Sequence, residues 1–170
     1  TSSLSISALQ QKIKFPQRVV GMHFFNPAYI MKLVEVVKGD QTNDNIVNAV
    51  LDISTQMDKV PVICMDAPGF IVNRIARHYY LEALKLVEEG IASYDDIDAI
   101  LEASGFKMGP FKLMDLIGMD VNLAVSQSLY NAFDPLDRFP PSDLHFGQVK
   151  KGELGNKTGK VFYNYPIQKL

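Results

Sequence analysis

The sequence is poor in the features that mark several classes of protein. Cys64 is the only cysteine, so no disulfide can form within the chain and nothing points to an oxidising compartment. No stretch approaches the roughly 20 uninterrupted apolar residues that cross a bilayer. The first residues lack the basic and then apolar pattern of a secretory signal. We therefore expect a cytoplasmic protein, and a mitochondrial one stays open because a transit peptide would precede Thr1.

The charged residues and histidines exclude further classes. Seventeen Lys and Arg against nineteen Asp and Glu leave a net charge of -2, whereas a nucleic-acid-binding surface carries a basic excess. His23, His78 and His145 are far apart, and none belongs to the Cys and His clusters typical of zinc sites. We predict no metal site, no nucleic-acid partner and no membrane association.

The first third of the chain has the pattern of an α/β segment. Apolar runs at residues 19–25 and 33–37 predict short buried strands, and residues 60–65 are a third strand candidate. Residues 42–59 show helical spacing. Strand, helix and strand in that order predict a parallel unit. However, no Gly-x-Gly-x-x-Gly loop joins a strand to a helix, and three strands cannot form a doubly wound sheet. The α/β part is therefore predicted to be incomplete or to be completed by another chain.

The rest of the chain has the pattern of helices. Asp66-Ala67-Pro68-Gly69 ends the last strand, and helical periodicity then continues to Gly90. The further predicted elements are a helix from a capping-box-like start at Ser93 to Gly105, a helical region from Met108 to about Phe133, a short helix to Lys151 and a strand-like run at residues 161–163. We predict an α/β remnant over residues 1–66 and an all-helical domain over residues 67–170.

His23 and Glu35 are the residues best suited to carry chemistry. Each lies in a predicted buried strand, where a lone histidine is more often a core residue bonded to backbone partners. A carboxylate among valines is costly unless it is paired. If the two strands are neighbours, Glu35 can bond one imidazole nitrogen and leave the other free to accept a proton. A carboxylate plays that role beside a general-base histidine.

Long motifs surround these residues and cover nearly the whole chain. They are His23-Phe24-Phe25-Asn26-Pro27, Met31-Lys32-Leu33-Val34-Glu35-Val36, Asp66-Ala67-Pro68-Gly69-Phe70-Ile71-Val72-Asn73-Arg74, Met108-Gly109-Pro110-Phe111, Gly155-Asn156-Lys157-Thr158-Gly159 and Phe162-Tyr163. In sequence and in order, these motifs resemble those of the L-3-hydroxyacyl-CoA dehydrogenases. The opening Thr1-Ser2-Ser3-Leu4 also resembles that family's serine-containing segment after a Rossmann strand.

The resemblance implies an NAD-dependent oxidoreductase that interconverts L-3-hydroxyacyl-CoA and 3-oxoacyl-CoA in fatty-acid metabolism. It implies the C-terminal portion of a Rossmann-type, NAD-binding domain followed by an all-α dimerisation domain. His23 would be the general base that takes the hydroxyl proton while hydride leaves C3 for NAD. Glu35 would hold the tautomer of His23 and stabilise the imidazolium.

Four further residues receive roles from the same resemblance. Ser2 and Asn73 would bind the substrate oxygen or thioester region of the acyl-CoA, and Asn26 and Lys157 would contact NAD. Plainer readings exist for three of them. Asn73 could be a solvated residue near a helix start, Lys157 a surface charge in a glycine turn, and Ser2 a residue loosened by a nearby chain end.

The sequence departs from the family in two places. The family's glycine-rich NAD loop, its acidic ribose-binding residue and most residues that hold CoA would precede Thr1. We therefore expect the chain alone to be inactive and to bind NAD weakly, and its sequence does not distinguish NAD from NADP. Val161 stands where the family usually has a glycine in its closing turn.

The helical part also predicts a homodimer. Residues 70–87 and 111–130 are both rich in apolar side chains, and a helical unit of about 100 residues has too little interior for both. Alternatively, the α/β segment covers the surplus. Two other functions stay open: a non-catalytic helical association module, and a related hydroxyacid or sugar-phosphate dehydrogenase. The latter enzymes share this plan but lack the motif that contains His23 and Glu35.

Overall fold

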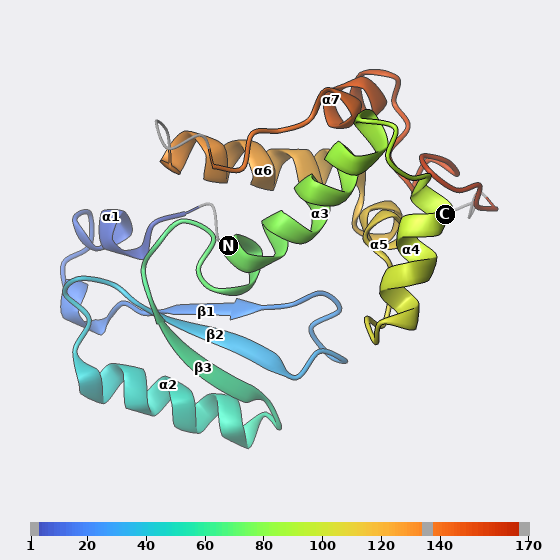
Figure 1. Cartoon of the computed structure of the whole chain (residues 1–170). Helices are drawn as coiled ribbons and strands as arrows, with labels where there is room; N and C mark the ends of the chain where they lie inside the picture. The colour runs from blue at the N-terminus through green and yellow to red at the C-terminus, as the bar shows by residue number, and fades with distance from the viewer. Residues whose placement is uncertain (1–3, 134–137, 167–170) are drawn as a thin grey trace. The chain divides into compact units, whose positions relative to one another are not determined.

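The computed structural model describes residues 4–133 and 138–166, and the chain divides into two compact units between Arg74 and Ile75 (Figure 1). The first unit contains α1 (Ile6–Gln10), a 3-10 helix (Pro16–Arg18), β1 (Gly21–Phe24), β2 (Leu33–Lys38), α2 (Asp44–Gln56) and β3 (Val60–Met65). Helix α3 (Val72–Glu88) begins at the end of the first unit and continues into the second. The second unit continues with α4 (Tyr94–Ala103), α5 (Pro110–Ile117), α6 (Met119–Phe133) and α7 (Asp143–Lys150).

The three strands form one sheet in the order β1-β2-β3. β2 and β3, which flank α2, are parallel as predicted, and β1 is antiparallel to β2. An antiparallel neighbour needs only a short connection, such as the one between β1 and β2. Helix α1 was not predicted, because this region was read as strands and turns. Its signal was Ser5, whose hydroxyl accepts a hydrogen bond from the amide of Ala8.

The two faces of the sheet differ because successive side chains of a strand alternate between them. Val34 and Val36 of β2 pack with Val47 of α2 in a buried apolar cluster. Figure 1 shows α2 along this face. Glu35 therefore projects to the opposite face. In the register of β1 and β2, its partner is His23. The face away from α2 thus carries both residues singled out in the sequence.

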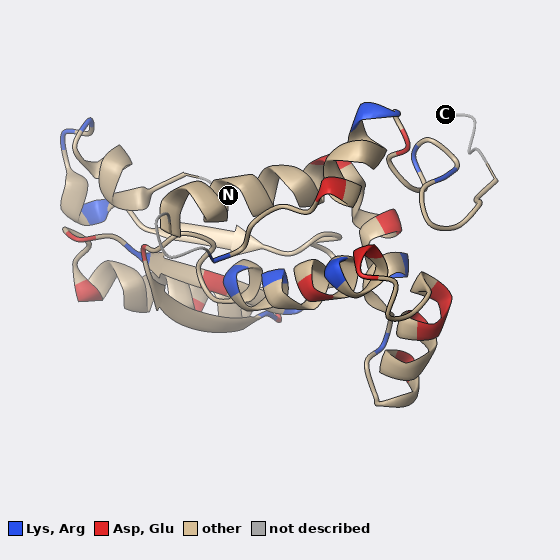
Figure 2. Ribbon diagram, turned by 45° about the horizontal axis from the view of Figure 1, so that its top comes forward, with Lys and Arg blue, Asp and Glu red and all other residues tan. Residues whose placement is uncertain are grey.

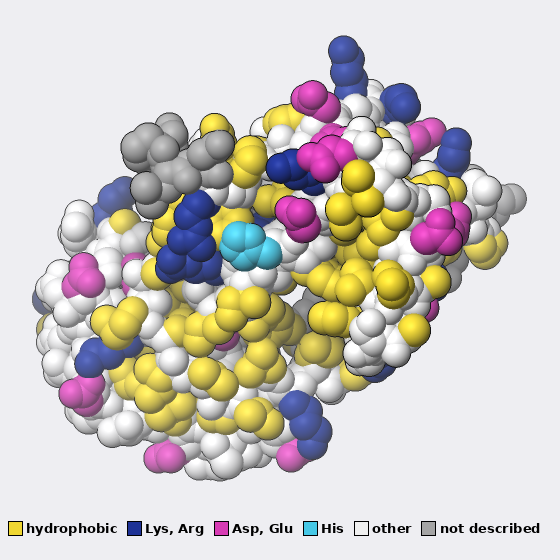
Figure 3. Space-filling view, in the orientation of Figure 1, with side chains coloured by type: hydrophobic (Ala, Val, Ile, Leu, Met, Phe, Trp, Pro, Cys, Tyr) yellow, Lys and Arg dark blue, Asp and Glu magenta, His cyan; other side chains and the backbone are white. Residues whose placement is uncertain are grey.

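β3 is one of the two edge strands that this sheet has among the described residues. Its side chains at Val60, Val62, Ile63 and Met65 are between 38% and 58% exposed. Figure 3 shows hydrophobic side chains at the surface of the sheet-containing unit. The strand that the sequence predicted over these residues is confirmed, and its exposure needs a separate explanation. A parallel strand is buried when neighbours cover it, and among the described residues no strand pairs with the outer edge of β3.

The second unit has its own apolar core, formed by α3, α4, α5, the start of α6 and the segment after α7. Its buried members are Tyr80, Ala83, Leu84, Ile97, Phe111, Met114, Met119, Val161 and Phe162. Basic and acidic residues are interspersed along the chain (Figure 2). The predicted helical region up to Phe133 is two helices separated by Gly118, whose φ of 102° favours glycine.

The predicted strand at residues 161–163 is absent, which corrects the sequence analysis. The amides of Phe162 and Tyr163 donate to the carboxylate of Asp115, at 3.4 and 3.0 Å, instead of to a neighbouring strand. Val161 and Phe162 are buried in the core of the second unit. The apolar run therefore reflects burial of an irregular segment, which periodicity alone does not separate from a strand.

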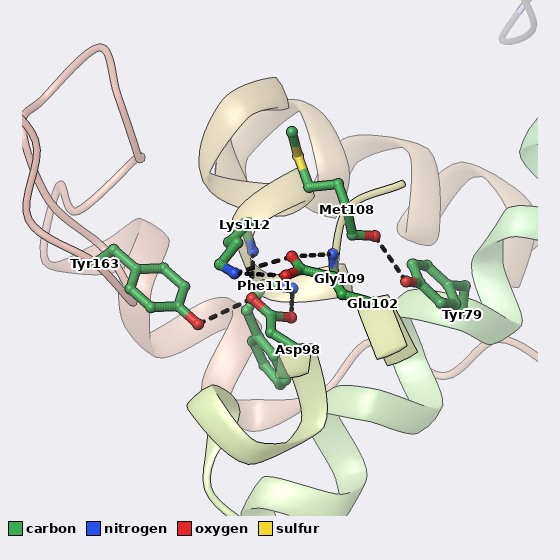
Figure 4. A network of polar contacts seen from close by, with 8 residues as sticks. All are labelled: Tyr79, Asp98, Glu102, Met108, Gly109, Phe111, Lys112 and Tyr163. Carbon is green, nitrogen blue, oxygen red and sulfur yellow. Dashed lines mark hydrogen bonds and ion pairs between the residues drawn. The ribbon is translucent and has the colours of Figure 1, made fainter. Parts of the chain in front are cut away.

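A second buried carboxylate, Asp98 of α4, organises the start of α5 (Figure 4). It accepts hydrogen bonds from the amides of Phe111 and Lys112 at 2.9 and 3.0 Å and from the hydroxyl of Tyr163 at 2.9 Å. Beside it, Glu102 pairs with the ammonium of Lys112 at 2.9 Å. Helix α5 begins at a proline after Gly109, which offers no capping side chain, so Asp98 supplies the missing acceptor.

Arg77 of α3 lies in a buried polar cluster with α6. It is 3% exposed, and its Nη1 donates to the carbonyl and side-chain oxygens of Asn122 and to Ser126. Burial lowers the pKa of Arg77 to about 10. His145 of α7 is fully buried and approaches the backbone of Met119, but within the described part of the chain neither ring nitrogen makes a hydrogen bond of normal geometry. Burial and the charge of Arg77 lower the pKa of His145 to about 4.

The low pKa of His145 predicts a loss of stability in acid. An unfolded histidine has a pKa of about 6.5, so unfolding takes up a proton between about pH 6.5 and pH 4. The contribution of neutral His145 is complete above this window and is lost as the pH falls through it. As the pH falls through this window, the titration of His145 should lower the free energy of unfolding by at most about 1.4 kcal/mol per pH unit.

Urea unfolding of wild type and His145→Gln across this pH range tests the prediction. The free energy of unfolding should depend less steeply on pH in the variant. His78→Gln, a change at an exposed histidine, should keep the wild-type slope. Equal slopes for wild type and His145→Gln would contradict the prediction.

Candidate active site

His23 lies in β1 with its Cα directly opposite that of Glu35 in β2. Residues opposite one another in an antiparallel pair share a face of the sheet, and their side chains are neighbours. The half-buried imidazole lies edge-on to the ring of Phe25, with the ring centres 5.1 Å apart, and to that of Phe70, at 5.6 Å. The ring is therefore held between two aromatic side chains beside a carboxylate.

Glu35 is 1% exposed, and one of its carboxylate oxygens caps the N-terminal end of α3. Its Oε1 accepts hydrogen bonds from the amides of Ile71 and Val72, both at 2.9 Å. The residues just before the helix, from Gly69 to Ile71, have no side-chain oxygen that could cap it. The N-terminal end of a helix also favours negative charge. The sequence analysis missed this capping role, and the only signal for it was the lack of a local cap.

The other oxygen of Glu35, Oε2, has no hydrogen-bond partner among the described residues. A hydrogen bond between Glu35 and the imidazole was predicted, and none is present among the contacts of the described residues. The carboxylate acts on His23 through its charge. Burial lowers the pKa of His23 below its ordinary value of about 6.5, and the charge of Glu35 opposes that shift. His23 is therefore mainly neutral at pH 7 and can accept a proton.

Two of the other predicted site residues are in the same unit. Asn73 is the second residue of α3 and follows Val72, whose amide binds Glu35. Asn26 lies just after β1, three residues beyond His23, and its side chain is exposed before a cis peptide bond to Pro27. His23 and Glu35 on the sheet and Asn73 at the start of α3 therefore all belong to the first unit.

The remaining two predicted residues are not placed with this group. Lys157 belongs to the second unit, where it is exposed in the turn between Gly155 and Gly159. Its ammonium forms an ion pair with Asp120 in the first turn of α6. Asp120 was not singled out in the sequence. Ser2 lies outside the described residues.

The described part of the chain contains neither a metal-binding cluster nor a helix that could cross a membrane. No group of three or more His, Cys, Asp or Glu residues is arranged to hold a metal ion. None of the described helices combines the length and apolar character that a membrane crossing needs.

Comparison with known proteins accounts for both parts of the chain. Residues 1–67 match the family described as 3-hydroxyacyl-CoA dehydrogenase, NAD binding domain. Residues 69–165 match the family described as 3-hydroxyacyl-CoA dehydrogenase, C-terminal domain.

Individual relatives give the same result. The chain is 48% identical to 3-hydroxyadipyl-CoA dehydrogenase of Escherichia coli (strain K12), over 99% of the chain and 36% of that protein. It is 40% identical to the mitochondrial hydroxyacyl-coenzyme A dehydrogenase of Sus scrofa, over 97% of the chain and 53% of that protein.

Among solved structures, 3-hydroxybutyryl-CoA dehydrogenase from Escherichia coli K12 matches with a TM-score of 0.94 at 48% identity. The match covers 100% of the chain and 36% of that structure. The chain thus spans between about a third and a half of the length of these relatives. With both of the family's domains matched in order along it, the chain belongs to the 3-hydroxyacyl-CoA dehydrogenase family.

Proposed function

We propose that the chain is the part of an NAD-dependent 3-hydroxyacyl-CoA dehydrogenase that carries the catalytic residues. The reaction is the interconversion of L-3-hydroxyacyl-CoA and 3-oxoacyl-CoA. The observation that carries the proposal is the pairing of His23 with the buried carboxylate of Glu35 across β1 and β2. Family membership supports the same reaction. The cytoplasmic location expected from the sequence belongs to the proposal as well, with a mitochondrial location as the alternative, because one relative is a mitochondrial enzyme.

The chemistry of His23 follows from its surroundings. In the oxidation direction, the neutral imidazole accepts the proton of the hydroxyl at C3 of the substrate. A bound nicotinamide ring would supply the acceptor for the hydride that leaves the same carbon. The buried negative charge of Glu35 stabilises the imidazolium that forms. In the reverse direction the imidazolium returns the proton to the oxygen. Oε2 of Glu35, which has no donor among the described residues, is the acceptor that an imidazole N–H would use to fix its tautomer.

The residues present fit part of a nicotinamide dinucleotide. The exposed amide of Asn26 follows the strand that carries His23, and it can bond ribose or carboxamide oxygens near the reacting carbon. The contact of Lys157, in the second unit, with NAD is proposed from the family resemblance alone. The chain has no Gly-x-Gly-x-x-Gly sequence, so it lacks the loop that binds the pyrophosphate of the dinucleotide. In the same proposal, Asn73 and Ser2 bind the substrate oxygen or thioester of the acyl-CoA.

We also propose that the second unit forms a homodimer. Leu116, Ile117 and Val121, at the junction of α5 and α6, are 56%, 40% and 47% exposed. They follow one another closely along the chain on either side of Gly118. Contiguous exposed apolar side chains of this kind mark interaction surfaces. All three lie within residues 111–130, the range whose many apolar side chains led to the homodimer prediction.

Replacing His23 tests the proposed base. His23→Gln, made in the full-length protein that contains this chain, should lower kcat by about 10²–10⁴-fold, the usual contribution of a general base. Acyl-CoA binding should persist, because glutamine keeps the size and polarity of the side chain. His78→Gln is the matched control and should keep wild-type turnover. A loss of less than tenfold for His23→Gln in steady-state assays would remove His23 from this role.

Replacing Glu35 tests the electrostatic pairing in the 170-residue chain itself. The carboxylate raises the pKa of His23 against the effect of burial, so Glu35→Gln should lower that pKa further. The glutamine carbonyl can still accept from Ile71 and Val72, which keeps the cap of α3. NMR titration of the His23 ring measures the shift. Asp52→Asn removes an exposed carboxylate on α2 and should leave the titration unchanged. An unaltered His23 pKa in Glu35→Gln would show that the carboxylate is only a structural residue.

Sedimentation equilibrium at micromolar concentration tests the dimer. The chain should sediment at twice its 19.0 kDa mass. Leu116→Glu should return it to the monomer, because a charge is costly in an apolar interface. Ile91→Glu places the same charge at another exposed isoleucine, in the turn between α3 and α4, and should leave the dimer intact. A single 19.0 kDa species for the wild type would refute the homodimer.

A further inference from the structure

The turn that carries Lys157 is fastened to the junction of α5 and α6. The amide of Asn156 donates to the carbonyl of Asp115 at 2.9 Å, and the amide of Met119 donates to the carbonyl of Leu154 at 3.3 Å. Within the turn, the hydroxyl of Thr158 accepts from the amide of Leu154 at 2.8 Å. These bonds fasten the residues just before Lys157 to the end of α5 and the start of α6, and the bond of Thr158 closes the turn after it.

Two glycines show how closely the parts approach. A Cβ at Gly155 would lie 2.1 Å from the carbonyl oxygen of Asp115, which no side chain could tolerate. A Cβ at Gly118 would lie 3.0 Å from both the Nζ of Lys157 and the Oδ1 of Asp120. Both glycines also have positive φ, 96° and 102°. The ion pair of Lys157 and Asp120 therefore lies directly over Gly118.

Stability does not account for this arrangement. The side chains of Lys157 and Asp120 are 44% and 41% exposed, and ion pairs at such exposure contribute little to folding. The neighbouring pair of Lys160 and Glu153, at 3.4 Å, shows that the same segment holds an ordinary surface ion pair as well. What Asp120 does achieve is to fix the direction of the Lys157 ammonium and to neutralise its charge.

We propose that Asp120 is a positioning residue, which orients Lys157 to donate to an uncharged oxygen of the nicotinamide dinucleotide and not to its phosphates. The inference rests on the proposed function, in which Lys157 contacts NAD. An ammonium has three N–H donors, and Asp120 takes one of them. The other two point away from the carboxylate. A phosphate brought to the same ammonium would be repelled by Asp120, whereas a ribose hydroxyl or a carboxamide oxygen would not.

The affinity for NAD, measured by calorimetry in the full-length protein that contains this chain, tests the inference. Asp120→Asn should raise the Kd roughly threefold to tenfold at high salt, as expected when one charge-assisted hydrogen bond loses its orientation. At low salt the uncompensated ammonium of the variant should attract the phosphates of NAD. The difference in Kd between the variant and wild type should therefore be smaller than at high salt. The Kd of the variant should therefore change more steeply than that of wild type between roughly 50 mM and 500 mM salt. A purely structural role for Asp120 would not alter this salt dependence.

Three further variants complete the test. Asp120→Glu restores the carboxylate and should restore most of the affinity, and Glu153→Gln, in the other ion pair, should behave as wild type. In a Lys157→Ala background, Asp120→Asn should have no additional effect on the Kd, because Asp120 acts through Lys157.

The outcomes separate the two proposals. If Lys157→Ala leaves the Kd unchanged, Lys157 does not contact NAD, and that part of the proposed function is lost together with this inference. If Lys157→Ala weakens binding but Asp120→Asn matches wild type at every salt concentration, the contact stands and the positioning role of Asp120 is wrong.

Discussion

The carboxylate of Glu35 is the group on which the first unit and its chemistry both depend. Removed from solvent in the middle of a valine-rich strand, it would be strongly unfavourable without partners. The amides of Ile71 and Val72 satisfy one oxygen, and that contact joins the central strand of the sheet to the first turn of α3. The same charge lies opposite His23 and raises its pKa against burial. A single side chain therefore links the position of a helix to the basicity of an imidazole.

The second unit uses the same physical device twice. Asp98 accepts from two successive amides at the start of α5, and Asp115 accepts from two successive amides near the end of the described chain. In each case a buried carboxylate satisfies backbone donors that regular secondary structure leaves unpaired. Charge-assisted hydrogen bonds are stronger than neutral ones, which helps to offset the cost of burial. The irregular segments of the fold are held at these three points.

The parts of this structure that the sequence predicted are those with local signals. Apolar runs, capping residues and glycines are read within a few positions, and the three strands and most helices followed from them. The pairing of His23 with Glu35 needed one extra assumption, that their strands are neighbours. The contact of Glu35 with Ile71 and Val72 joins residues 36 and 37 positions apart, and neither isoleucine nor valine reveals it.

The errors have the same origin. The run that contains Val161 and Phe162 has the composition of a strand, but its amides are satisfied by a side chain from α5. A helical pattern was read across Gly118, although its backbone conformation ends one helix and precedes the next. Asp120 carried no local signal, since an acidic residue in the first turn of a helix is common for electrostatic reasons alone.

The open edge of β3 has a consequence for how the chain behaves outside its native surroundings. A strand edge presents unpaired backbone donors and acceptors, and most proteins protect such edges with charges, prolines or bulges. Along β3 the protection is slight: Pro61 is the only proline, and the exposed side chains at Val60, Val62, Ile63 and Met65 are all apolar. Strands of this composition readily add to one another. During synthesis and purification, this edge is accordingly prone to aggregation, and an added charge at Ile63 should help to keep the chain in solution.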